Sequence, residues 1–437
     1  MPENFIIKYW YKNEKLTGAA SDHVFRYLSA FSDYKFVEDK DTPVIWRDTE
    51  SKAPASARVI LSNEIEKGDS LNAPAGDNGN CLYISPDPIE RIFEKISIKT
   101  TVGPYSDSEH RPDDFPEESL GGMIKSFFNH LKENDIIQSS EGDFSLWPRG
   151  YSFALAVTHD VDMIRRSVLG SVRLLFKRDV PGGFKGLLDS VKSFLGLAGN
   201  PYDGITDWID HEKRIGLKST FFVFPGNRNN KNDPKYKINQ LKKSIEDIKK
   251  SGFELGLHSG IECYKGDSIT ESKEILSQST RISISGIRPH YLSASLPEYW
   301  RAAAENGFEY SSCLGFDEEI GFYQGIDLPF MPFDKDNNAG LGIVEIPIAI
   351  MDCGLIENDP LNYAELSGHA KKLINRVKDA RGILVLDWHQ RTMYNVDYPG
   401  WAEIFFDLID YARNEAAYFI SPGETARHLK SKMAVND

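Results

Sequence analysis

Two aspartates separated by one residue close an apolar run in the first half of the chain. Asp160 and Asp162 follow the run FALAVT, which begins at Phe153. On an extended chain, side chains two positions apart point to the same side, so both carboxylates are expected in one site. Two crowded carboxylates repel each other, and both stay ionised only if a cation neutralises one of them. The pair indicates a divalent-metal site, although a solvated turn after a strand gives the same pattern.

A histidine and a glutamate offer further ligands for such a metal. His258 ends the run FELGLH, and Glu262 lies four residues later, a spacing that places two side chains on one face of a helical turn. Aspartate, histidine and glutamate can supply three ligands to a catalytic zinc and leave one position open for water. Zinc lowers the pKa of that water from 15.7 to roughly 7, so hydroxide is available at neutral pH. These residue types predict a metal hydrolase.

Four more residues at the ends of later runs suit the remaining tasks of a hydrolase. Arg288 keeps its charge and offers a planar fork of donors, suited to holding a carboxylate such as Asp160 in its ionised form. A histidine ordinarily titrates near pH 6.5, so His389 is a candidate for protonating a departing amine or alkoxide. Trp388 and Tyr291 can supply apolar walls for a sugar ring, although Trp388 fits a core position equally well.

An alternation of apolar runs and helical patterns positions these residues. From Tyr151 onward the chain contains about eight strand-like runs, among them STFFVF, IVEIPIAI and GILVL, with helical segments between most of them. This alternation is typical of a parallel sheet or barrel, in which functional residues collect beyond the carboxyl ends of the strands. The predicted fold class is α/β, a (β/α) barrel of about seven or eight strands. Residues 163–200 form a long insertion after the first strand, which is typical of a lid or a substrate-binding element.

The length of the chain predicts a second domain. At 437 residues it exceeds the size at which a single core stops growing. Residues 1–147 alternate short strand-like runs with helical stretches and carry no chemical motif. We expect them to form a small N-terminal α/β domain of unknown role, with the barrel domain at residues 148–437.

Charge and cysteine content exclude several function classes. The formal net charge of -14 disfavours nucleic acid and anionic membranes as partners, because an acidic surface repels phosphates over about 8 Å. The four cysteines show no CxxC spacing and are too sparse for a disulfide framework, which indicates a reducing compartment. No signal-peptide pattern and no run of about 18 apolar residues is present. These features predict a soluble cytoplasmic protein without a membrane span.

Five ordered segments carry a resemblance to a known family. THDVD, STFFVF, LGLHSGIE, GIRPHYL and LVLDWHQ stand in the order seen in the polysaccharide deacetylase superfamily, also called the NodB-homology or carbohydrate esterase family four-like group. The chain resembles this family over about residues 153–429. The resemblance implies a NodB-like barrel and a carbohydrate substrate, an amino-sugar glycan or its precursor, from which an acetyl group is removed. It also implies a divalent metal, zinc first and cobalt, nickel or manganese as alternatives.

The same resemblance implies roles for individual residues. Asp160 matches the general base, Asp162 and His258 match metal ligands, Arg288 matches the residue that orients the base, and His389 matches the general acid. A backbone N–H after the arginine commonly helps to hold the oxyanion in this family. That donor would lie near His290 or Tyr291, so these two residues and Trp388 are the candidate substrate contacts.

Two departures from the family pattern leave alternatives open. The first motif reads Asp-Val-Asp where many members have adjacent aspartates, and Glu262 stands where a second histidine is usual. Glutamate adds negative charge and makes the metal a weaker Lewis acid. Either Glu262 completes the metal site, or His290 replaces it, or the metal is lost and the protein is a decayed glycan-binding protein. A further alternative is a hydrolase of a small C–N compound, such as a ureide or formamide, on the same fold.

Overall fold

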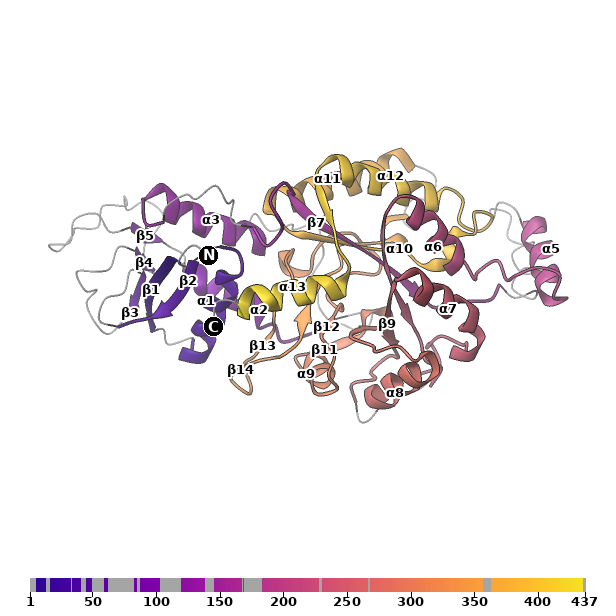
Figure 1. The fold of residues 1–437 in the computed structure, drawn as a ribbon, viewed down its shortest axis with the longest axis horizontal. Coiled ribbons are helices and arrows are strands. Elements are labelled where there is room, and N and C mark those ends of the chain that lie inside the picture. Colours follow the sequence, from indigo (N-terminus) through magenta and orange to yellow (C-terminus); the bar gives the residue numbers. More distant parts are fainter. Residues whose placement is uncertain are drawn as a thin grey trace.

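The protein is described by a computed structural model in which a small and a large sheet lie along the long axis (Figure 1). The described residues are 5–12, 16–32, 34–40, 45–48, 59–61, 82–84, 87–102, 119–137, 145–166, 168, 183–227, 230–265, 268–356 and 363–434.

The large sheet has nine strands, and all of its pairings are parallel. Its order is β15-β12-β10-β9-β8-β7-β17-β16, with β18 beside β7. This arrangement fits the predicted (β/α) barrel. The strands are β7 (Phe153–Val161), β8 (Thr220–Val223), β9 (Glu254–Ser259), β10 (Gly286–Pro289), β12 (Tyr310–Ser311), β15 (Val344–Glu345), β16 (Ile350–Met351), β17 (Ile383–Asp387) and β18 (Ala417–Phe419).

Strand β7 lies near the middle of this sheet and is buried along its whole length. Parallel strands are covered on both faces, which explains why its first part is a continuous apolar run. The strand register places Thr158 of β7 opposite Asp387 of β17, and Arg288 of β10 opposite His258 of β9. The polar residues that end these strands therefore lie at one rim of the sheet.

The run IVEIPIAI closes the barrel instead of forming the single strand that its sequence predicts. It contains one edge strand, β15, and the first residue of the other, β16, with Pro347 between them, and proline cannot donate a backbone hydrogen bond. On one side of the proline, Ile346 N donates to Ser311 O at 2.9 Å, and on the other, Ala349 N donates to Val385 O at 3.1 Å. The run thus passes from one edge of the sheet to the other, and Asp352 follows Met351, the last residue of β16.

Helices cover the outside of the large sheet (Figure 1). In α12 the buried side chains recur at helical spacing, as expected for an amphipathic helix that faces the core. Within the described ranges, no helix is both long and apolar enough to cross a membrane. The helices are α5 (Gly183–Phe194), α6 (Ile205–Arg214), α7 (Lys242–Ser251), α8 (Ser268–Thr280), α9 (Glu298–Glu305), α10 (Asp352–Ile356), α11 (Tyr363–Ala380), α12 (Trp401–Asn414) and α13 (Pro422–Ala434), with 3-10 turns at Ile238–Leu241, His290–Leu292, Tyr323–Gly325 and Gln390–Met393.

The small sheet is also parallel, in the order β2-β1-β3-β4-β5. Side-chain caps begin its helices: Thr17 Oγ1 accepts from Ala20 N, Asp87 caps a helix that starts with a proline, and Ser119 caps the third. Its elements are β1 (Phe5–Lys12), α1 (Gly18–Ser29), β2 (Tyr34–Glu38), β3 (Ile45–Asp48), β4 (Val59–Leu61), β5 (Leu82–Ile84), α2 (Pro88–Ile96) and α3 (Leu120–Glu133).

The N-terminal elements are fastened to the barrel by backbone and side-chain hydrogen bonds. Strand β6 (Thr100–Val102) pairs antiparallel with β11 (Ala294–Leu296), which lies between the barrel elements β10 and α9. Tyr27 of α1 donates to Pro329 O at 2.9 Å, and His23 Nε2 donates to Met331 O at 2.8 Å. The latter two contacts lie just before the hairpin of β13 (Phe333–Asp334) and β14 (Ala339–Gly340).

The burial of His23 predicts that the folded protein is less stable in acid. Burial lowers the pKa of His23 below its ordinary value of 6.5, so the folded protein binds fewer protons than the unfolded chain. The free energy of unfolding should therefore fall as the pH drops through about 6.5. In His23→Gln, which keeps a donor but does not titrate, we expect a smaller drop in melting temperature between about pH 7.5 and 5.5. An equal drop in melting temperature in both proteins would show that protonation of His23 does not contribute to the loss of stability in this pH range.

Candidate metal centre and active site

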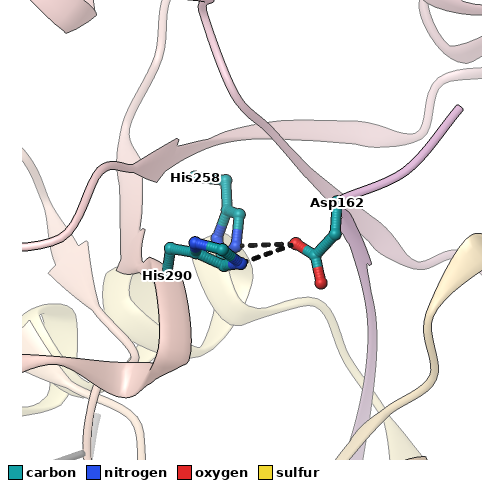
Figure 2. A group of neighbouring side chains, drawn as sticks. All are labelled: Asp162, His258 and His290. Atoms are coloured by element: carbon teal, nitrogen blue, oxygen red, sulfur yellow. Dashed lines mark ion pairs between the residues drawn. The ribbon is translucent and has the colours of Figure 1, made fainter. Parts of the chain in front are cut away.

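Three side chains from different strand ends point at one another beyond the carboxyl rim of the barrel (Figure 2). Asp162 follows β7, His258 belongs to β9, and His290 follows β10. Asp162 Oδ1 lies 3.1 Å from His258 Nε2 and 3.6 Å from His290 Nε2. Asp160 lies on the same side, with its Oδ2 3.9 Å from His258 Nδ1. The structure thus brings both aspartates and His258 together at one place.

The polar atoms of this group suit a divalent cation. Asp162 Oδ1, both ring nitrogens of His258 and Nδ1 of His290 are buried and have no hydrogen-bond partner. Buried polar atoms without partners are costly, and a cation beside Asp162 would satisfy its Oδ1 together with the His258 Nε2 that faces it. One carboxylate oxygen and two imidazole nitrogens are also a donor set that zinc accepts at a catalytic site. The residues therefore fit the metal that the sequence predicts.

The charges of the group agree with this interpretation. Burial raises the pKa of Asp162, but the imidazoles of His290, His258 and His389 outweigh that effect and hold it well below its ordinary value. Burial lowers the pKa of His290 to about 4, against the smaller opposing effect of Asp162. At neutral pH Asp162 is therefore anionic and His290 neutral, the forms in which both bind metals. Burial lowers the pKa of His258, but Asp160 and Asp162 outweigh burial and raise it, so a metal would displace a proton from this ring.

Glu262, the third ligand expected from its spacing, lies outside this group. Its side chain is 54% exposed and pairs with Lys265, with 2.7 Å between Oε1 and Nζ. The expectation required a helical turn that includes His258, but His258 is in a strand and Glu262 has a left-handed backbone with a φ of 55°. His290, the replacement considered from the sequence, supplies the third donor of the group instead.

Arg288 joins Asp160 to a second buried carboxylate. Its Nη1 donates to Asp160 Oδ1 at 2.8 Å and to Asp387 Oδ1 at 2.5 Å, while Nη2 and Nε donate to Ser312. Thr158 Oγ1 also donates to Asp387 Oδ1, at 2.6 Å. Burial and the nearby Asp160 raise the pKa of Asp387 to about 6. The fully buried guanidinium is thus held by two carboxylates and by Ser312, and it positions the Asp160 carboxylate.

His389 lies on the other side of Asp162 and is held by an acidic partner. Its Nδ1 is 2.7 Å from Asp352 Oδ1, its backbone N–H donates to Asp352 Oδ2, and its Nε2 is 3.1 Å from Asp162 Oδ2. Because the Asp352 carboxylate can only accept, Nδ1 carries a proton and Nε2 faces the site. Burial lowers the pKa of His389, but Asp352 and Asp162 outweigh it and hold the pKa well above its ordinary value. The imidazole is therefore suited to give up a proton from Nε2.

Sequence reasoning missed two residues of this site, Asp352 and Arg391. Asp352 begins α10 directly after β16, and Arg391 Nη1 lies 3.4 Å from Asp162 Oδ2. The signal for Asp352 was present, since it follows the apolar run IVEIPIAIM as the other site residues follow theirs. No comparable pattern marks Arg391, whose position depends on the 3-10 turn after His389.

Two predicted substrate contacts have different surroundings. Trp388 is fully buried and packs against Phe405 of α12, with ring centroids 5.7 Å apart, so it is a core residue and not a wall for a sugar. Side chains alternate along a strand, and Asp387 occupies the face that looks into the site. Tyr291 is 44% exposed, and its ring lies 4.3 Å from the His290 ring, at the edge of the metal group.

Comparisons with known proteins give distant structural likenesses. No protein-family model and no curated protein matches the sequence. A Mycobacterium smegmatis protein designated a polysaccharide deacetylase is 20% identical, with 65% of this chain and 93% of that chain covered and a TM-score of 0.43. Puue allantoinase is 15% identical, with 65% and 92% covered and a TM-score of 0.45. A peptidoglycan N-acetylglucosamine deacetylase is 14% identical, with 63% and 89% covered and a TM-score of 0.31. Scores this low assign no function, which is inferred below from the site itself.

Proposed function

We propose that this protein is a metal-dependent hydrolase of carbon–nitrogen bonds that removes an acetyl group from an amino sugar of a polysaccharide or its precursor. One observation carries the proposal: the Asp162, His258 and His290 donors meet beside a fixed carboxylate and a protonated imidazole. Asp162, His258 and His290 would hold the metal. When bound, such a metal lowers the pKa of water and polarises the acyl carbonyl.

The residues around the donors suit the two proton transfers of amide hydrolysis. Asp160, fixed by Arg288, takes the proton from the attacking water, and the water oxygen forms the new bond to the acyl carbon. His389 Nε2 gives its proton to the nitrogen as the C–N bond breaks, so that acetate and a free amine leave. Asp352 keeps the imidazole oriented through Nδ1, and a backbone N–H near His290 or Tyr291 remains a candidate oxyanion donor.

The decayed-site alternative loses its main support. It rested on Glu262 in place of a second histidine, yet the donor group contains three side chains without Glu262. The alternative of a small ureide or formamide substrate has the same chemistry at the reacting bond, so only substrate tests separate it.

Acetate release from N-acetylglucosamine oligomers tests the proposal. We expect protein saturated with zinc, cobalt, nickel or manganese to release equal amounts of acetate and free amine, and chelation to lower the rate at least about tenfold. Hydrolysis of allantoin or a formamide without acetate release would replace the proposed substrate. Less than about a tenth of an equivalent of metal after saturation and desalting would refute the metal site itself.

A further inference from the structure

Helix α5 turns apolar side chains outward, the reverse of an ordinary surface helix. It projects from the barrel at the end remote from the small sheet (Figure 1). Phe184, Leu188 and Phe194 are 74%, 44% and 81% exposed, and the next two apolar residues, Leu195 and Leu197, are 62% and 75% exposed. These residues are five of the eight large hydrophobic side chains that are exposed in the described structure. Contiguous exposed apolar surface of this kind marks an interaction site.

The opposite face of α5 fixes this orientation. Ser190 accepts a hydrogen bond from Arg166 Nη1 at 3.0 Å, and Asp189 accepts one from Tyr394 at 2.8 Å. Arg166 is held in turn by Asp397, with Nε 2.5 Å from Oδ2. Gly186 lies against the Arg166 guanidinium, with no room for a β-carbon. The small and polar face therefore packs on the barrel, and the apolar face has no freedom to turn inward.

The order of residues around α5 is that of a helix lying at a membrane surface. At about 100° per residue, and with the helical path extended by one residue to Leu195, six apolar side chains fall within an arc of about 120° around the helix axis. In order around the helix they are Phe194, Leu187, Val191, Phe184, Leu195 and Leu188. Exposed Lys185 and Lys192 come next, at one border of that arc. The nearest acidic side chain, Asp189, is turned to Tyr394. Lysines at the border of an apolar stripe can reach anionic headgroups while the stripe enters the acyl boundary.

We propose that α5 and the residues that follow it, through Leu197, dock on an anionic lipid bilayer. The net charge of -14 disfavours an anionic membrane for the surface as a whole, but it acts little at α5, because charges more than about 8 Å from the headgroups are screened and α5 projects beyond the barrel. The contact would be an interfacial one, in keeping with the absence of a spanning helix among the described residues. The sequence alone predicts a lid or substrate-binding element at residues 163–200, of which 167 and 169–182 lie outside the described residues. The described part of that insertion fits a bilayer better than a lid, because its apolar stripe faces away from the barrel.

Vesicle flotation tests the proposal without reference to metal or catalysis. We expect the full-length protein to float with vesicles of phosphatidylcholine and phosphatidylglycerol, and less with phosphatidylcholine alone. The double variant Phe184→Glu/Leu188→Glu should bind at least about tenfold more weakly, because two apolar side chains no longer enter the bilayer. Lys185→Gln/Lys192→Gln should lose the preference for phosphatidylglycerol and the salt dependence of binding.

Matched controls distinguish vesicle binding through α5 from nonspecific binding by other parts of the surface. Tyr151→Glu changes a side chain that is 45% exposed just before β7, near the amino ends of the barrel strands, and should bind vesicles as the parent protein does. Circular dichroism should show that all variants are folded, since every changed side chain is exposed. Absence of flotation by the parent protein would overturn the proposal, as would equal flotation of the Phe184→Glu/Leu188→Glu variant. A dimer of the parent protein that this variant disrupts, in place of vesicle binding, would show that a second copy covers α5.

Discussion

Replacing His290 by glutamine is expected to lower zinc affinity by at least about a hundredfold, whereas Glu262→Gln should leave it unchanged. Loss of a residue that only supports a ligand costs up to about a hundredfold, so loss of a ligand itself should cost no less. The difference follows from position: His290 Nε2 lies 3.6 Å from Asp162 Oδ1, while Glu262 is paired with Lys265 at the surface. Isothermal titration of metal-free protein with zinc measures both affinities.

His258→Gln provides a second test of the same site. Both ring nitrogens of His258 are buried without hydrogen-bond partners, so this variant should lose zinc to the same degree as His290→Gln. Melting temperatures in chelator show whether either variant is unfolded for another reason. If Glu262→Gln loses zinc and His290→Gln keeps it, the donor group described above is not the metal site.

Asp160→Asn and His389→Ala are each expected to lower kcat for acetate release by about a hundredfold or more. General acid or base catalysis contributes a factor of about a hundred to ten thousand, and each variant removes one partner of a proton transfer. The asparagine side chain in Asp160→Asn keeps the shape of the carboxylate and can still accept from Arg288, so a loss of activity would report the loss of basicity. The His389 variant removes the imidazole that faces Asp162 and is held by Asp352. Steady-state rates at saturating substrate measure the effect.

Exposed residues of the same types supply the controls for these variants. Asp410→Asn changes a side chain that is 69% exposed on α12, and His130→Ala changes an exposed residue on α3. Both controls should keep the parent rate. Zinc content and circular dichroism show whether the site variants remain folded and loaded. Unchanged turnover in folded, zinc-loaded Asp160→Asn or His389→Ala would refute the role assigned to that residue.

Much of the barrel could be predicted from local sequence because its buried strands have a recognisable pattern of apolar residues. A strand that is covered on both faces must be apolar throughout, and a polar residue is tolerated only where the strand ends. The position of Asp160, Asp162, His258 and Arg288 at one rim follows from this rule together with parallel pairing. The division into two domains at residue 147 and the catalytic roles stay predictions.

The ligand set was decided by tertiary structure. Spacing favoured Glu262, but His258 lies in a strand and the left-handed backbone at Glu262 sends its carboxylate to solvent. The choice of His290 depends on the pairing of β10 beside β9, a contact between segments about thirty residues apart for which local spacing gives no signal.

Barrel closure was decided in the same way. The run IVEIPIAI has the composition of one strand, yet it serves both edges of the sheet, because Pro347 interrupts the pairing and the two edges lie close together only in the folded chain. Because the run reaches the second edge, Asp352 lies beside His389. The sequence by itself thus determined the kinds of side chain and the rim on which they gather, because these depend on local patterns of burial. Which of them meet depended on long-range strand pairing, whose geometry no local pattern encodes.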